Sequence, residues 1–162
     1  MGTDIHVRII KRDHDTDTWK QIKLYRKEKR KFKIVDIYSY REEDLFDILS
    51  EKTNDYRTYP YRAYPISLTH LPIGLKQEIE KKQKISGYYD FKEINLADLK
   101  IYLMHTPKIR DWNYEDNDPK AWIDNPVKYF IERIELYLDL AEPDWNIDSP
   151  PSDIRILYWF DN

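Results

Sequence analysis

Two polar residues near the start of the chain have the spacing needed to act on one ligand. Asp4 and His6 lie two residues apart in a segment of alternating apolar and polar residues, so both side chains point to one side of a predicted strand. A carboxylate beside an imidazole can work as an acid–base pair. The same pair can instead hold the strand against a helix, and two groups are too few for a metal site. Both interpretations stay open.

A tandem pentapeptide is the most unusual segment, because Tyr-Arg-x-Tyr-Pro occurs over residues 56–60 and again over 61–65. Proline stiffens an extended chain, aromatic rings stack on bases, and guanidinium groups bind phosphates. The repeat is therefore a candidate nucleotide clamp, or else a surface strap whose rings pack on the domain. The predicted ligand-binding residues are Asp4, His6, Arg41, Tyr56, Arg57, Tyr59, Tyr61, Arg62, Tyr64 and Trp112.

A third candidate is the segment 107–125, which shows no clear periodicity. It carries Trp112, Tyr114 and Trp122 among several carboxylates. Long loops in compact domains are usually functional or disordered, and the aromatic residues argue against disorder. The segment is a candidate lid or partner-binding surface, or a loop packed by its own rings.

The residue types that are missing exclude several classes of site. The chain has no cysteine, which excludes disulfide bonds, thiolate metal sites and a cysteine nucleophile. Its three glycines form no P-loop, dinucleotide fingerprint or GxSxG turn. The aspartates of 13–17 alternate as in a calcium loop, but Thr18 and Leu24 stand where that loop needs glycine and glutamate. We predict no catalytic residue, no metal and no cofactor.

The charges are unevenly distributed along the chain. Residues 111–162 contain 13 acidic and 4 basic residues, a charge of −9, whereas the whole chain carries −3. Basic residues concentrate in 20–33, a run that is most simply a solvated face. One basic stretch in an acidic protein argues against duplex nucleic acid as a partner. No apolar run is long enough for a membrane span and no signal peptide is evident, so we expect the cytoplasm.

The periodicity predicts an α+β fold in a single domain, residues 1–162. Residues 4–10 alternate as a half-buried strand, and 13–17 forms the turn of a hairpin. Residues 153–160 are apolar on both faces, which is typical of a central strand, so the two ends of the chain are expected as neighbours in a small sheet. A strand-like run covers 32–40. Helices are predicted over 44–49, 74–84, 96–104 and 126–141, with Asn95 and Asn125 as caps.

Three blocks of sequence resemble a known family. Residues 1–6 (MGTDIH), 40–49 (YREEDLFDIL) and 154–162 (IRILYWFDN) are similar to the MGxDIH opening, the RNYDLFxIL block and the VRIxWFDN ending of a family of phage and prophage proteins. That family has a cysteine at its third position and a histidine-rich stretch beyond the middle. This chain has Thr3 and the histidine-free segment 87–91 there. The resemblance implies a phage setting, in which small proteins often act against host defences.

Two functions from different classes fit these features. The first is a phage-encoded counter-defence protein that sequesters a small anionic, nucleotide-type ligand or immune signal in the host cytoplasm. The second is an inhibitor that binds a host defence protein through its acidic C-terminal half. An enzyme that uses Asp4 and His6 is a third candidate, although no nucleophile or metal set accompanies the pair. The sequence leaves a homo-oligomer open.

Overall fold

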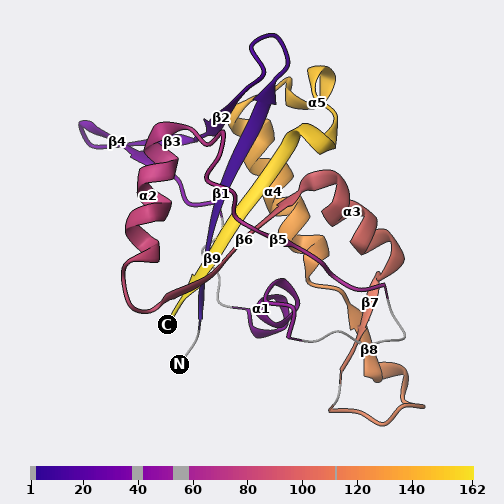
Figure 1. Cartoon of the computed structure of the whole chain (residues 1–162). Helices are drawn as coiled ribbons and strands as arrows, with labels where there is room; N and C mark the ends of the chain where they lie inside the picture. The colour runs from indigo at the N-terminus through magenta and orange to yellow at the C-terminus, as the bar shows by residue number, and fades with distance from the viewer. Residues whose placement is uncertain (1–2, 38–41, 53–58, 112) are drawn as a thin grey trace.

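A computed structural model describes residues 3–37, 42–52, 59–111 and 113–162. Its centre is a five-stranded antiparallel sheet in the order β2-β1-β9-β6-β5 (Figure 1). The strands of this sheet are β1 (Asp4–Asp13), β2 (Thr18–Ile22), β5 (Tyr64–Pro65), β6 (Tyr88–Asn95) and β9 (Ile154–Asp161). Two further hairpins lie outside it, formed by β3 (Tyr25–Glu28) with β4 (Lys31–Ile34) and by β7 (Lys108–Arg110) with β8 (Trp122–Asp124).

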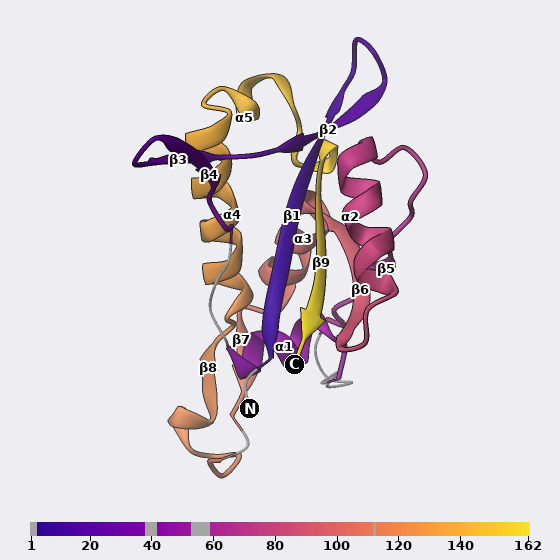
Figure 2. The ribbon, with the colours of Figure 1, turned by 90° about the vertical axis from the view of Figure 1, so that its left-hand side faces the viewer.

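Helices lie on both faces of this sheet, and the α+β prediction is confirmed. The helices are α1 (Glu43–Leu49), α2 (Ile73–Gln83), α3 (Leu96–His105), α4 (Val127–Ala141) and α5 (Trp145–Asp148), with 3-10 turns at Pro119–Ala121 and Pro151–Asp153. Figure 2 shows α4 on one side of β1 and β9 and α2 on the other. No described helix is long and apolar enough to cross a membrane.

The final strand is the centre of the sheet, as its sequence predicts. It pairs with β1 on one side and β6 on the other, and Asp4 lies opposite Asp161 in the first of these ladders. Of the seven residues from Ile154 to Phe160, all but Arg155 are buried. A strand at the edge of a sheet could not bury so many residues on both of its faces. The prediction that the two ends of the chain are sheet neighbours is confirmed.

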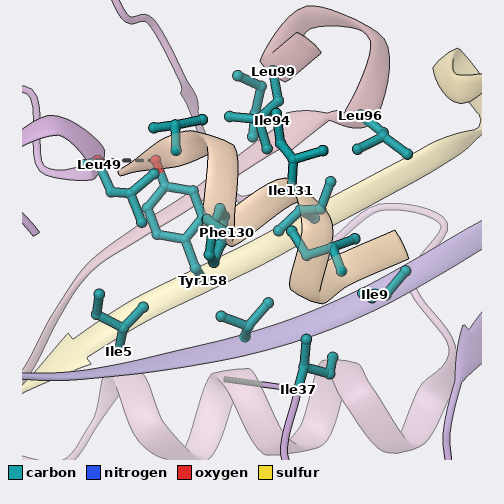
Figure 3. Packing of buried hydrophobic residues seen from close by; sticks show 14 of the residues in the cluster. Ile5, Ile9, Ile37, Leu49, Ile94, Leu96, Leu99, Phe130, Ile131 and Tyr158 are labelled. Carbon is teal, nitrogen blue, oxygen red and sulfur yellow. Dashed lines mark hydrogen bonds between the residues drawn. The ribbon is translucent and has the colours of Figure 1, made fainter. Parts of the chain in front are cut away.

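The larger hydrophobic core fills the face that α1, α3 and α4 cover. Ile5 and Ile9 of β1 and Tyr158 of β9 meet Leu99 and Phe130 there (Figure 3). These strand residues recur at every second position and the α4 residues at three-and-four spacing, so each element offers one apolar face to the same space. A smaller core on the other face joins Ile10, Leu157 and Trp159 to α2.

Two helix starts follow the predicted capping chemistry. The Asn95 side chain accepts a hydrogen bond from the Asp98 backbone N–H at 2.7 Å, which opens α3. The Asn125 side chain accepts from the Val127 backbone N–H at 3.0 Å, which opens α4. Each bond satisfies one of the backbone donors that the first turn of a helix leaves unpaired. The cap at Asn95 is confirmed, whereas the N-cap position of α4 is Pro126 and Asn125 bonds to the first helical N–H from one residue earlier.

The run 32–40 is not one strand, which corrects the prediction. Phe32 and Ile34 are exposed in β4, whereas Ile37 is buried in the larger core. The chain leaves the hairpin at Val35, whose N–H donates to the Leu24 carbonyl at 2.8 Å, and then returns to the body. Residues 38–41 lie outside the described residues.

The strand β6 is a second difference, since no strand was predicted from the sequence over Tyr88–Asn95.

A chain of buried tyrosine hydroxyls crosses the larger core. Tyr158 donates its O–H to the Leu49 carbonyl at 2.9 Å, and Tyr61 donates to the Tyr158 oxygen at 2.7 Å. Burial raises the pKa of Tyr158 well above its ordinary value and raises the pKa of Tyr61 as well. Burial also raises the pKa of Tyr102 and of Tyr137. All four phenols therefore stay protonated in the folded chain when unfolded phenols ionise.

We expect the free energy of unfolding to fall once the pH rises above about 10, the ordinary tyrosine pKa. Below that value both states hold the phenol protons, so this contribution is fully present. Above it the unfolded chain loses protons that the folded chain keeps, which favours unfolding by up to about 1.4 kcal/mol per pH unit and group. Urea unfolding followed by circular dichroism at successive pH values measures the slope. The double variant Tyr61→Phe, Tyr158→Phe should flatten it, and an unchanged slope would contradict the assignment.

Candidate functional site

The described part of the tyrosine repeat is bound to the chain itself. Tyr61 is 2% exposed, and its ring meets the edge of Tyr102 at 5.2 Å between centroids. The Tyr59 ring stacks on His105 at 4.7 Å, and its carbonyl accepts a hydrogen bond from the Thr106 hydroxyl at 3.1 Å. Tyr61 is thus a core residue that no ligand reaches from solvent. The surface-strap interpretation accounts for these two rings.

The other predicted ligand contacts fall into two groups. Arg62 and Tyr64 are exposed, and Tyr64 lies in β5 at the edge of the sheet. The strands β9 and β6 separate β5 from β1, so Tyr64 lies about three strand spacings, or about 14 Å, from β1. Arg41, Tyr56, Arg57 and Trp112 lie outside the described residues, and Asp4 and His6 lie in β1.

His6 is oriented by a carboxylate from the far end of the chain. Its Nε2 lies 3.0 Å from Asp161 Oδ2, and because an ionised carboxylate only accepts, Nε2 carries the proton. The imidazole also stacks on Trp159, with 5.9 Å between centroids and 13° between planes. Beside it Arg8 donates to Glu78 of α2 at 2.7 Å. These contacts tie β1 to β9 and α2, which favours the structural interpretation of His6.

Metal ligation finds no support in the described residues. Across 3–37, 42–52, 59–111 and 113–162, no three histidine, aspartate or glutamate side chains are grouped so that they could hold a metal ion. His6 and His14 each face a single carboxylate, of Asp161 and Asp153 respectively. A zinc site needs three or four protein ligands, so neither pair is one by itself.

A polar hollow of about 420 Å³ lies beside the turn of the β1–β2 hairpin. This turn and α5 occupy the same end of the sheet (Figure 1). Pockets that hold small ligands commonly measure about 300–1,000 Å³. The residues that line the hollow are Lys11, Arg12, Asp13, His14, Asp15, Lys20 and Ser149.

Two lysines of the hollow stand directly opposite each other. The β1–β2 register pairs Lys11 with Lys20, and both line the same hollow. Opposite residues on one face of an antiparallel ladder have Cβ atoms about 4.5–5.5 Å apart, and like charges at such a pair destabilise the sheet. Lys20 bonds to Glu142 at 2.6 Å, whereas no described residue forms an ion pair with Lys11. An anion between the two ammonium groups would remove the repulsion.

His14 adds an oriented imidazole to the same hollow. Its Nε2 bonds to Asp153 Oδ2, and Asp153 is buried in the 3-10 turn that precedes β9. Because the carboxylate accepts only, Nε2 again carries the proton and Nδ1 is the nitrogen left for a ligand. A protonated imidazole would donate from Nδ1 to an anion. The neighbouring carboxylate of Asp13 is used locally, since it accepts from the Asp15 backbone N–H at 2.9 Å.

The flanking arginine is held by its own partner. Arg12 Nε donates to Asp17 Oδ1 at 2.8 Å, and this hydrogen bond lowers the pKa of the Asp17 carboxyl. Asp17 adopts a positive φ of 52°, a left-handed conformation that closes the turn. The turn 13–17 is therefore organised by its own carboxylates, which accept from backbone N–H groups and from Arg12. This use agrees with a polar hairpin turn and not with calcium ligation.

The sequence alone did not indicate this hollow. Residues 13–17 resemble a calcium loop with mismatches or a hairpin turn, and His14 is not among the predicted ligand-binding residues. The hairpin register, which places Lys11 opposite Lys20, could have been read from the turn and the flanking apolar residues. Nothing local could have indicated Asp153, which lies 139 residues from His14.

The acidic segment 107–125 forms the β7–β8 hairpin and is held in shape by one arginine. Arg110 has 6% of its side-chain surface exposed, and its Nη2 donates to the Tyr114 carbonyl at 2.6 Å and to Asp116 at 2.8 Å. Arg110 Nη1 bonds to backbone carbonyls of the same hairpin. The rings of Tyr114 and Trp122 remain partly exposed. The β7–β8 hairpin projects away from the hollow and is not a lid over it (Figure 1).

Comparison with models of protein families, with curated proteins and with solved structures finds no match to this chain. The phage resemblance thus stays a prediction from three sequence blocks. Two of those blocks do meet in space, because β1 pairs with β9 and His6 lies opposite Trp159. The third contributes α1, whose Phe46 ring meets the Phe160 ring edge-on at 4.8 Å.

Proposed function

We propose that this protein binds a small phosphate-bearing ligand of nucleotide type in the hollow beside the β1–β2 turn. The observation that carries the proposal is the like-charged pair Lys11 and Lys20, set opposite each other where they line one cavity. Glu142 already offsets the charge of Lys20, whereas no described residue forms an ion pair with Lys11, so a phosphate in the hollow would supply the counter-ion that Lys11 lacks. The oriented imidazole of His14 supplies a further donor at the same place.

Capture of the ligand, and not its conversion, is the activity we propose. Sequestration needs only a stable complex, which cations and hydrogen-bond donors provide. In the phage setting that the resemblance implies, removal of a nucleotide signal from the host cytoplasm would be a counter-defence function. The His14–Asp153 pair could also move a proton, so the ligand must be recovered and identified to separate capture from turnover.

Equilibrium binding to adenosine, AMP and a cyclic dinucleotide tests the proposal. We expect the two phosphate-bearing probes to bind at least about tenfold more tightly than adenosine, because charged hydrogen bonds contribute about 1.5–3 kcal/mol each. Lys11→Gln and Lys20→Gln should each weaken that binding by about tenfold. Lys84→Gln, an exposed lysine at the end of α2, is the matched control.

Equal affinity for adenosine and AMP, or unchanged binding in both lysine variants, would overturn the proposal. Mass spectrometry of the ligand released by heat adds the second readout. An intact ligand supports capture. A changed ligand that His14→Asn no longer changes would replace sequestration by acid–base catalysis at the same hollow.

Docking on a basic host protein is the second candidate, and the Arg110 contacts favour it. They hold the acidic β7–β8 hairpin in one shape before any partner binds, which lowers the entropy cost of association. Its carboxylates would meet a basic surface, so the complex should weaken steeply with added salt. A pulled-down host protein whose binding does not change with salt, or with Arg110→Ala, would count against this function.

A further inference from the structure

The β3–β4 hairpin projects from the body of the protein (Figures 1 and 2). It pairs only with itself, and every residue of both strands is exposed. Its base is fixed, because the Leu24 N–H donates to the Tyr137 hydroxyl of α4 at 2.7 Å. A two-stranded hairpin without further cover is only marginally stable. A ligand that covers this hairpin would therefore also stabilise it.

The hairpin has two chemically different faces. The register places Tyr25 opposite Ile34 and Lys27 opposite Phe32. Opposite residues share a face, so this face carries the apolar and aromatic side chains of Tyr25, Phe32 and Ile34 together with Lys27. Phe32 is 73% exposed, Tyr25 54% and Ile34 48%. Large rings exposed this far on a projecting element are a surface for contact with another molecule.

The whole hairpin and its approach are densely basic, on the other face, at the turn and at Lys23 and Lys27. Between residues 23 and 34 the chain has seven lysines and arginines and one glutamate. Arg26 bonds to Glu28, and the described part of the chain gives no ion pair to the other six cations. Those six are Lys23, Lys27, Lys29, Arg30, Lys31 and Lys33. The charge is therefore available to a polyanion.

The turn keeps a cation where glycine would fit more easily. Lys29 has a φ of 55°, in the left-handed region that favours glycine. The tip is an open surface that presents Glu28, Lys29, Arg30, Lys31, Phe32 and Lys33 together. Cations and an exposed ring thus lie side by side on the tip.

We infer that the β3–β4 hairpin is a binding arm for single-stranded nucleic acid. Ammonium and guanidinium groups bind phosphates, while exposed rings stack on successive bases. Bases of a duplex are stacked on one another and are not open to Phe32 and Tyr25, so the rings favour a single strand over a duplex. An acidic protein surface would pair with the cations but would give the exposed rings no bases to stack on. This inference stands apart from the hollow at Lys11 and Lys20.

Fluorescence anisotropy with a labelled oligothymidylate tests the arm. We expect Phe32→Ala to weaken binding by about tenfold, the loss of one stacked base. The variant should keep its melting temperature, because Phe32 is 73% exposed and belongs to neither hydrophobic core of the described residues. Tyr129→Ala removes an exposed ring from α4 and is the control, with unchanged binding expected.

The salt dependence separates the phosphate contacts from the stacking. Each of Lys31→Gln and Lys33→Gln should reduce the slope of log affinity against log salt by about 0.7, whereas Phe32→Ala should leave it unchanged. Lys84→Gln, outside both proposed sites, should not alter oligothymidylate binding. Tighter binding to the matched duplex, equal competition by polyglutamate, or no effect of Phe32→Ala would each overturn the inference.

Discussion

Replacing Phe130 by alanine should lower the free energy of unfolding by about 3–5 kcal/mol. Phe130 is fully buried in α4, where its ring lies among Tyr158 and Ile131 (Figure 3). Its removal forfeits the burial of the ring and leaves a cavity that the sheet and helices cannot close. Because whole domains are stable by only about 5–15 kcal/mol, the variant should lose a large share of its stability.

Urea unfolding monitored by circular dichroism measures this loss, and the neighbouring residue supplies the control. Tyr129 precedes Phe130 on α4 but points to solvent, so Tyr129→Ala should change the free energy of unfolding by no more than about 0.5 kcal/mol. A loss below about 1 kcal/mol for Phe130→Ala would contradict the packing described for the larger core.

Asn125→Ala should cost about 2–4 kcal/mol, an unusually large effect for a polar residue. Asn125 is fully buried and makes three hydrogen bonds. Its Oδ1 accepts from the Val127 N–H, and its Nδ2 donates to the Tyr102 hydroxyl at 3.0 Å and to the Thr106 carbonyl at 2.8 Å. Alanine would leave these buried partners unsatisfied, and each such group costs about 1–3 kcal/mol.

Asn125→Asp separates the cap from the two donated bonds, because aspartate keeps the acceptor and loses the amide donors. We expect thermal and urea unfolding to show that this variant also remains destabilised. Asn113→Ala, in an exposed part of the same hairpin, should be neutral. Full recovery in Asn125→Asp would mean that only the cap of α4 matters and that the bonds to α3 are dispensable.

Asn125 also connects stability to the acidic hairpin. Its backbone N–H donates to the Pro107 carbonyl at 3.0 Å, which closes the base of the β7–β8 hairpin, while Arg110 organises the tip. Loss of the Asn125 contacts should therefore loosen the hairpin as well as α4. Hydrogen exchange of the Ile109 and Ile123 amides, in β7 and β8, would report this loosening separately from global unfolding.

The two projecting hairpins differ in charge. The basic β3–β4 hairpin and the β7–β8 hairpin lie toward opposite ends of the molecule (Figures 1 and 2). The basic run is concentrated on one short two-stranded element, whereas segment 107–125 holds only five of the 13 acidic residues of 111–162, and the other eight follow it in the sequence. A nucleotide-type ligand or single strand at the basic end and a basic partner at the acidic end are thus spatially compatible.

The interpretation of the tyrosine repeat changes most in the structure. Rings and arginines in tandem have the composition of a nucleotide clamp, but composition does not say which side chains face solvent. Tyr61 reaches inward to Tyr158, and Tyr59 lies on His105. A buried tyrosine usually has a hydrogen-bond partner for its hydroxyl. The partner of Tyr61 is Tyr158 of β9, which lies 97 residues later in the sequence.

Local patterns in the sequence determined the elements that depend on neighbours along the chain. The period of α4, the caps at Asn95 and Asn125, the N-terminal hairpin and the doubly apolar final strand all follow from spacings of two to four residues. The same patterns predicted the α+β class and the pairing of the first and last strands in one sheet.

Only the tertiary structure decided which distant residues form sites. The partners His14 and Asp153, His6 and Asp161, and Tyr61 and Tyr158 are brought together by strand pairing and by packing across the sheet. A local pattern fixes on which side of its own element a residue lies, but not which other element covers that side. The hollow at Lys11 and Lys20, the projecting arm and the burial of Tyr61 therefore required the fold.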